Sequence, residues 1–374
     1  MSKTLLRHEV PVEQTWNLND LFSSEKEWEK ALSSVNGELE SVTKYKGHLQ
    51  DNAKTLLDCL LAKDALTERV MRVMTYASLR QSEDGTNPDN QANSSRVSSM
   101  ISQVSADLSF IESEILEMNE ETINSFIEQE VGLVEFQTTL FTILEKQPYK
   151  LSAEAEEVLS AFGEVLDAPY MIFLRSKTSD MQFNSFTTDD GTEHELTFNS
   201  FPKYEGSPNT EVRRKAYDAF VKTLTQYKNT YAATYATEVK KQVVEARLRK
   251  YDSVTDMLLH DQQVTKEMYH NQLDTIQREL APHMRKFAKL KQRVLGLEKM
   301  HFCDLKAPLD PEFNPQISYE EASKVVLESL QVMGEEYMEI MERGLSDRWV
   351  DLADNVGKGS GAFCSSPYGA HPYI

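Results

Sequence analysis

The sequence predicts a mainly α-helical protein of long amphipathic helices, with one small β-hairpin and a glycine-rich extended edge strand at the C-terminus. Three observations support this fold class. Apolar residues recur three and four positions apart along most of the 374 residues, a spacing typical of amphipathic helices. Asp190-Gly191, a dipeptide favoured in tight hairpin turns, interrupts that pattern. Four glycines gather near the chain end, at positions 357, 359, 361 and 369.

The first 118 residues are predicted to form an extended arm followed by three long helices. Ser24 and Glu27 form a capping box that starts the first helix, which should end near Gly47. The second helix carries apolar positions from Leu56 to Ala77 and is expected to end in the polar loop of residues 82–89. The third is expected over residues 91–118 and buries one apolar stripe. The stripe of the first helix is Trp28, Leu32, Val35, Leu39 and Val42, and that of the third is Val97, Ile101, Val104, Leu108, Ile111 and Ile115.

Helices are expected to continue through the middle of the chain with one interruption. The helical pattern breaks after Pro169, and short apolar runs over residues 171–198 predict a small antiparallel hairpin. The other predicted helices lie at 121–130, at 133–146, after Ser152, after Asn209, at 264–295 with an interruption or a kink near Pro282, and from a capping box of Ser318 and Glu321 toward Gly334.

An aromatic stripe follows Asn209 at helical spacing. It consists of Tyr217, Phe220, Leu224, Tyr227, Tyr231 and Tyr235. Such a stripe packs between helices more often than it lines a ligand channel. Core packing is therefore the preferred interpretation, with a ligand channel as the alternative.

The composition excludes several classes of partner. The chain has 40 Lys and Arg against 60 Asp and Glu, a formal net charge of −20 that repels nucleic-acid phosphates and anionic membranes. No apolar run approaches the ~20 residues of a membrane span, and the first ten residues lack the apolar core of a secretory signal. The three cysteines form no CxxC pair, which indicates reduced thiols. We expect a cytoplasmic protein and leave a homo-oligomer open.

The histidines do not form a recognisable zinc motif. A gluzincin site needs two histidines one helical turn apart with a glutamate directly after the first. None of the chain's eight histidines has that partner: His8-Glu9 is followed by Val12, and His194-Glu195 by Phe198, where the second histidine should stand. A phosphate-binding loop, a nucleophile elbow and a dinucleotide-binding glycine motif are also absent from the sequence.

Several segments, taken in order, resemble the oligoendopeptidase F group of the thimet-oligopeptidase-like zinc metallopeptidases. The matching segments are residues 76–80, 151–152, 246–253, 301–309 and a long C-terminal run over 335–374. The last run includes Asp347-Arg-Trp-Val-Asp-Leu352 and Pro372-Tyr-Ile374. Together these segments cover nearly the whole chain.

The resemblance implies a mostly helical, two-lobed fold around a deep channel in which zinc-dependent enzymes cut short oligopeptides. In such enzymes an HExxH helix follows the Pro-Tyr-Ile match, and a glutamate further on is the third zinc ligand. Neither is found in this sequence, which ends at Ile374. The resemblance therefore predicts three parts: an N-terminal helical subdomain over 1–118, a helical lobe with the hairpin over 119–350, and the start of a catalytic domain over 351–374, truncated before the zinc motif.

The same resemblance implies a substrate-binding edge near the C-terminus, with no catalytic and no metal-binding residue in this chain. Its residues here are Gly359, Gly361, Ala362, Phe363, Tyr368 and His371. Three positions depart from the family pattern: Gly359 replaces a common basic residue, Phe363 a common Tyr, and His371 a usual Asn or Asp. The loss of the Tyr hydroxyl puts any polar contact from position 363 in doubt.

Two hypotheses follow. The first is a zinc-dependent endopeptidase of oligopeptides, represented by a fragment that lacks HExxH and is inactive alone. The second is a non-catalytic helical peptide-binding or scaffold protein. Gly359, Gly361 and the aromatic stripe motivate the second hypothesis, because an open groove can hold a peptide without a metal.

Overall fold

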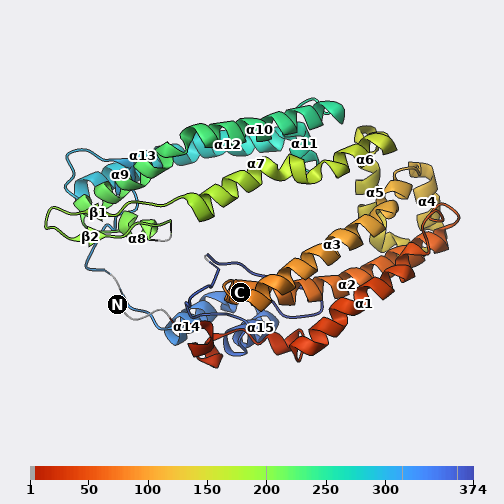
Figure 1. Ribbon diagram of the computed structural model, residues 1–374, viewed down its shortest axis with the longest axis horizontal. Helices are drawn as coiled ribbons and strands as arrows, with labels where there is room; N and C mark the ends of the chain where they lie inside the picture. Colours follow the sequence, from red (N-terminus) through yellow and green to blue (C-terminus); the bar gives the residue numbers. More distant parts are fainter. Residues whose placement is uncertain (1–4, 199, 314, 360) are drawn as a thin grey trace. The chain divides into compact units, whose positions relative to one another are not determined.

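The computed structural model describes residues 5–198, 200–313, 315–359 and 361–374. The chain divides into two compact units, which we call unit 1 (Met1–Gln147 with Gln316–Ile374) and unit 2 (Pro148–Pro315). Both are built mainly from helices, as predicted (Figure 1). The three predicted parts, over residues 1–118, 119–350 and 351–374, are not these two units, and they stay a prediction.

Unit 1 is organised around three long helices that run alongside one another: α1 (Glu25–Thr43), α2 (Ala53–Glu83) and α3 (Pro88–Ile115) (Figure 1). Their starts are set by side-chain caps, since Ser24, Asn52 and Asn87 each accept a hydrogen bond from a backbone N–H of the first turn. The shorter helices of unit 1 are α4 (Glu120–Gln129), α5 (Gln137–Glu145), α14 (Tyr319–Leu330) and α15 (Glu335–Ser346).

The core of unit 1 lies between these helices. All five predicted stripe residues of α1 are buried, and on α3 four of six are buried, with Ile101 and Leu108 partly buried. Trp28 is fully buried, and its indole Nε1 donates to the carbonyl of Val73 on α2 at 3.0 Å. Burying a large apolar side chain stabilises the fold by about 1.5–3 kcal/mol, so these stripes hold α1 to α3 together.

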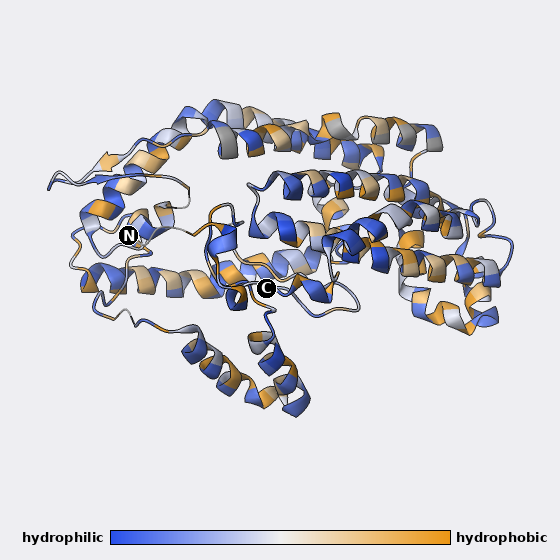
Figure 2. Cartoon of the chain, turned by 60° about the horizontal axis from the view of Figure 1, so that its bottom comes forward, coloured by the Kyte–Doolittle hydropathy of each residue, from blue (hydrophilic) through white to orange (hydrophobic). Residues whose placement is uncertain are grey.

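Unit 2 consists mainly of helices. Its helices are α6 (Ala153–Ala161), α7 (Gly163–Arg175), α8 (Phe201–Glu205), α9 (Thr210–Gln226), α10 (Lys228–Leu248), α11 (Val254–His260), α12 (Lys266–Thr275) and α13 (Ala281–Val294). Orange hydrophobic positions alternate with blue hydrophilic ones around the helices, as expected of amphipathic segments (Figure 2). Many apolar side chains of α10, α12 and α13 stay exposed.

The predicted hairpin is confirmed and is short. β1 (Phe186–Thr187) pairs antiparallel with β2 (Glu193–His194). Gly191 takes a φ of +86° in the turn, a conformation that glycine adopts without strain. Phe186 packs with Leu196 and Ala216 in a small core of unit 2.

Two prolines behave differently from each other. The prediction that the helical pattern breaks after Pro169 is wrong, because α7 contains Pro169 and continues to Arg175. A proline inside a helix removes one backbone hydrogen bond, and here the remaining turns still form. The predicted interruption near Pro282 is found: a π-helical turn over Ile276–Leu280 joins α12 to α13, and Pro282 lies in the first turn of α13.

The C-terminal segment, residues 351–374, does not form the predicted regular strand in its described part. Its β contacts are isolated bridges, from Asn355 to Leu5 and from Ser365 to Tyr373. Gly357 and Gly361 have φ values of +82° and +94°. Such values belong to turns rather than to extended backbone, so these two glycines lie in turns and not in the predicted edge strand.

None of the described helices combines the length and the apolar character that crossing a membrane requires.

Candidate functional site

The C-terminal segment carries all six residues predicted to bind substrate. Gly359, Gly361, Ala362, Phe363 and Tyr368 are exposed, and His371 is partly buried. The side chains of Phe363 and Tyr368 are 47% and 79% exposed. Apolar rings with that much free surface are available for contact with a ligand.

The glycines at the start of this segment pack against the end of α2 and the loop that joins α2 to α3. The N–H of Gly85 donates to the carbonyl of Gly357 at 2.8 Å, and the N–H of Gly359 donates to the carbonyl of Ser82 at 2.8 Å. A Cβ on Gly357 would lie 2.6 Å from Oδ1 of Asp84, which is too close. The backbone that lies close to these glycines is therefore the protein's own, at residues 82 and 85.

A buried ion cluster lies just before the glycines. The carboxylate of Asp351 is fully buried and faces Arg7 Nη2 at 2.6 Å and Lys358 Nζ at 2.7 Å. Burial alone would raise the pKa of Asp351, but the hydrogen bonds from Arg7 and Lys358 outweigh it and hold that pKa below its ordinary value. Arg7 also pairs with Glu83 at 2.7 Å. Burial raises the pKa of Glu83 despite the attraction of Arg80 and Arg7.

His371 is committed to internal contacts. Its ring stacks on Trp349 with centroids 4.6 Å apart and an interplanar angle of 4°. Its Nε2 lies 3.1 Å from Oδ2 of Asp20, and its Nδ1 lies 2.8 Å from the carbonyl of Pro372. These contacts hold His371 at the end of the chain, and only 13% of its side chain is exposed.

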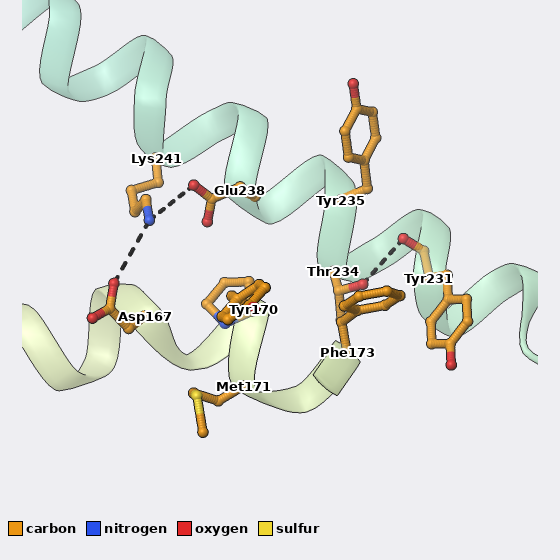
Figure 3. Close-up of a pocket in the computed structure, with 10 residues that line it drawn as sticks. Asp167, Tyr170, Met171, Phe173, Tyr231, Thr234, Tyr235, Glu238 and Lys241 are labelled. Atoms are coloured by element: carbon orange, nitrogen blue, oxygen red, sulfur yellow. Dashed lines mark hydrogen bonds and ion pairs between the residues drawn. The ribbon is translucent and has the colours of Figure 1, made fainter. Parts of the chain in front are cut away.

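A second candidate site is a pocket of about 740 Å³ in unit 2, between α7 and α10 (Figure 3). It is lined mainly by aromatic and apolar side chains, with charged groups at one end. The lining residues are Asp167, Pro169, Tyr170, Met171, Phe173, Tyr231, Thr234, Tyr235, Glu238 and Lys241.

The charged end of the pocket is incompletely paired. Lys241 Nζ lies 2.9 Å from Oε1 of Glu238 and 4.0 Å from Asp167 (Figure 3). The other oxygen of Glu238, Oε2, is buried and has no hydrogen-bond partner in the described part of the chain. A buried acceptor without a donor costs about 1–3 kcal/mol, so a ligand that brings an N–H would be favoured there.

The aromatic stripe after Asn209 divides between the two interpretations. Phe220 packs in the small core, stacked on Phe201 with centroids 4.0 Å apart. Tyr231 and Tyr235 instead line the pocket, and Tyr235 is 72% exposed. The helical spacing of these residues does not distinguish a ring that packs in the small core from one that lines the pocket.

The sequence also gave no indication of Arg7, Asp351 and Lys358 as a cluster. Arg7 and Asp351 are 344 positions apart. The signal that existed was indirect, because Asp351 lies within the C-terminal run that carries the family resemblance.

The described residues do not fit a zinc ion. Over residues 5–198, 200–313, 315–359 and 361–374, no three His, Cys, Asp or Glu side chains come together as a metal site. His194 stacks on Phe186 with centroids 4.8 Å apart, as part of the hairpin. Zinc requires converging nitrogen, sulfur or carboxylate ligands, which these residues do not provide.

Comparison with known proteins gives consistent matches along the chain. A family model described as Oligopeptidase F matches residues 114–183, and one described as Peptidase family M3 matches residues 204–374. Oligopeptidase PepF of Bacillus subtilis (strain 168) is 35% identical over 98% of this chain, and Group B oligopeptidase PepB of Streptococcus agalactiae is 29% identical over 98% of it. The chain spans 55% and 61% of the lengths of these two proteins, respectively.

Solved structures agree with these matches. Oligoendopeptidase-F from Enterococcus faecium superposes with a TM-score of 0.68 and 28% identity, over 86% of this chain and 60% of its own. A crystal structure from Chlamydophila abortus gives a TM-score of 0.79 at 23% identity, over 99% of this chain and 62% of its own, which is a likeness of fold alone.

Proposed function

Because this chain belongs to the M3 family of peptidases, in its oligoendopeptidase F group, we propose that it serves the zinc-dependent hydrolysis of short oligopeptides. The observation that carries the proposal is the match to Oligopeptidase PepF, which runs along 98% of the chain at 35% identity. We further propose that its helices form the two-lobed, channel-lining fold implied by the resemblance, in a cytoplasmic enzyme.

In this proposal the chain contributes peptide contacts rather than the metal centre. The candidate contacts are Gly359, Gly361, Ala362, Phe363, Tyr368 and the free edge of His371. The exposed rings of Phe363 and Tyr368 would bury apolar side chains of a bound peptide, and the backbone near Gly361 and Ala362 would pair with the peptide backbone. Exposure of these groups supports the proposal.

Peptide hydrolysis by this chain alone is not expected, because its sequence contains no HExxH and its described residues do not fit zinc. The test is to incubate the purified chain with zinc and an internally quenched oligopeptide. We expect no increase in fluorescence beyond the peptide alone. An increase that a chelator abolishes would overturn the proposed inactivity.

The second candidate function is non-catalytic peptide binding in the pocket between α7 and α10. The observation that favours it is Oε2 of Glu238, which is buried and has no hydrogen-bond partner among the described residues, in a pocket that Tyr170 and Tyr235 also line. A peptide N–H would satisfy that oxygen while an apolar side chain fills the pocket. Replacing Tyr235 by Ala, with calorimetric titration of an oligopeptide, tests this site, since Tyr235 lies in unit 2 and the C-terminal segment in unit 1.

A further inference from the structure

We propose that the N-terminal arm, residues 5–22, positions the C-terminal segment for peptide binding, with the carboxylate of Asp351 as the anchor that joins them. This inference rests on the proposed function of the C-terminal segment. The arm is built from three short 3-10 turns, over Arg7–Glu9, Val12–Gln14 and Leu18–Asp20, and has no long helix of its own.

The backbone of the arm bonds to the C-terminal segment and to the residues just before it. The N–H of Val356 donates to the carbonyl of Leu5 at 2.8 Å. The N–H of Leu352 donates to the carbonyl of Gln14 at 3.0 Å. The N–H of Asn17 donates to the carbonyl of Arg348 at 3.1 Å. These bonds fix the register between two stretches of irregular backbone.

The carboxylate of Asp351 accepts hydrogen bonds from both the N-terminal arm and the C-terminal segment. Arg7 donates to both carboxylate oxygens, from Nη1 at 3.0 Å and from Nη2 at 2.6 Å. The backbone N–H of Trp16 donates to Oδ2 at 3.2 Å. From the other direction, Lys358 Nζ donates to Oδ1 at 2.7 Å and also to the carbonyl of Ala353 at 2.6 Å. One buried carboxylate therefore holds the arm and closes the loop that precedes the glycines.

Trp16 extends the contact to the proposed peptide-binding residues. Its side chain is buried, and its Nε1 donates to the carbonyl of Ile374 at 2.8 Å. Its ring lies 5.9 Å from that of Phe363, at an interplanar angle of 52°. The buried Trp16 ring therefore packs against Phe363, which is about half exposed.

The positioning role follows from the lack of regular structure in the C-terminal segment. Isolated bridges alone leave a segment open to local unfolding, because few hydrogen bonds must break together. The buried carboxylate of Asp351 opposes such unfolding, because opening the segment must break its charge-assisted hydrogen bonds to Arg7 and Lys358 together. Asp351 and Arg7 would therefore act on peptide binding through Phe363 and its neighbours, without contacting the peptide.

The test uses Arg7→Met in the full chain, with Arg7→Lys as the conservative variant and Arg278→Met as the matched control. Arg278 belongs to unit 2, is exposed and pairs with the neighbouring Glu279. Two quantities are measured: hydrogen exchange over residues 361–371 and within α2, and the calorimetric affinity for an oligopeptide. Trp16→Phe is a second variant, which keeps an aromatic ring and removes the bond to Ile374.

We expect Arg7→Met to speed exchange over residues 361–371 by about tenfold and to weaken peptide binding by a similar factor, with exchange in α2 unchanged. In Arg7→Lys, exchange over residues 361–371 and peptide affinity should both lie between those of Arg7→Met and the unmodified chain. Arg278→Met should change neither quantity. Trp16→Phe should speed exchange and weaken binding by less than Arg7→Met does. Unchanged exchange over residues 361–371 in both Arg7→Met and Trp16→Phe, or an equal rise in α2, would overturn the positioning role.

A failure of the proposed function would be distinguishable. If the unmodified chain binds no oligopeptide, the peptide-contact role is refuted, and exchange over residues 361–371 still decides whether the arm holds the C-terminal segment. If Arg7→Met does not fold, the comparison of Arg7→Lys and Trp16→Phe with Arg278→Met gives the same decision.

Discussion

Arg213 and Asp304 form an ion pair in the interior of unit 2, with Nη2 and Oδ1 3.0 Å apart and both side chains fully buried. Arg213 also donates to the carbonyls of Ser207 and Pro208, at 2.7 and 2.9 Å. The other carboxylate oxygen of Asp304 accepts from Arg214 at 3.0 Å. This network ties α9 to the turn over residues 302–304, across a part of unit 2 with a small apolar core.

Replacing Arg213 by Met should lower the free energy of unfolding by about 3–5 kcal/mol, because it leaves the buried carboxylate of Asp304 short of a partner. The measurement is urea unfolding followed by circular dichroism. Arg278→Met, on an exposed surface, should change the unfolding free energy by less than about 0.5 kcal/mol. Equal effects of the two variants would contradict the structural role of the pair.

Acid should weaken the fold through the same carboxylate. Burial alone would raise the pKa of Asp304, but bonds from the N–H of His301 and from Arg214 and Arg213 hold that pKa below its ordinary value. A carboxyl group with a lowered folded-state pKa stabilises the protein above its unfolded pKa of about 3.9, and that stability is lost as the pH falls through the lower folded value.

The midpoint temperature of unfolding should therefore fall below about pH 4 in the unmodified chain. In Asp304→Asn this fall should be smaller. Asp304→Asn should itself be less stable near neutral pH, because Arg213 then lacks its anion. The midpoint is measured by thermal unfolding at a series of pH values. An identical acid slope in both proteins would rule out a linked titration of Asp304.

Gly357 should tolerate no side chain, for two separable reasons. Its φ of +82° disfavours other residues, and a Cβ would meet Asp84 and Thr86 at 2.6 and 3.0 Å. Gly47 has the same φ of +82° and nothing within 4 Å of a Cβ, so it is the matched control. Gly47→Ala should cost about 1–2 kcal/mol, the strain of the left-handed backbone, and Gly357→Ala clearly more. Equal costs in chemical unfolding would show that the loop yields to the methyl group.

The aromatic stripe after Asn209 should behave as two different sets in mutagenesis. Phe220→Ala should cost about 3 kcal/mol, because the ring stacks on Phe201 and Phe183 in the small core. Tyr235→Ala should change stability by less than about 0.5 kcal/mol, because the ring is 72% exposed. Thermal unfolding of the two variants checks the division. A large loss in Tyr235→Ala would mean that this ring is part of a packed interface.

The sequence was most informative where structure is decided locally. Ser24 accepts from the N–H of Glu27 at the start of α1, which is one of the two bonds of the predicted capping box, and Ser318 with Glu321 forms the complete capping box of α14. These bonds join residues three positions apart, so the local sequence indicates them. The hairpin around Asp190-Gly191 was equally accessible, because its turn chemistry lies in one dipeptide.

Contacts between residues far apart in the sequence could not be predicted from local patterns. Nothing in the local pattern pairs Arg7 with Asp351, because that contact depends on how distant elements pack. Glycines at positions 357 and 361 were consistent with an extended face or with turns, and the backbone angles show turns. A proline at position 169 predicts the end of a helix from local sequence. In the structure α7 continues through Pro169 and packs against α10.

The C-terminal segment, as the proposed peptide-contact surface of an M3 peptidase chain, is tested most directly by calorimetric titration of an oligopeptide into three proteins. These are the unmodified chain, the variant Phe363→Ala with Tyr368→Ala, and the pocket variant Tyr235→Ala. Saturable binding is expected for the unmodified chain and for Tyr235→Ala, and a loss of binding for the double variant. Binding that survives in the double variant and disappears in Tyr235→Ala would contradict a peptide-contact surface in the C-terminal segment.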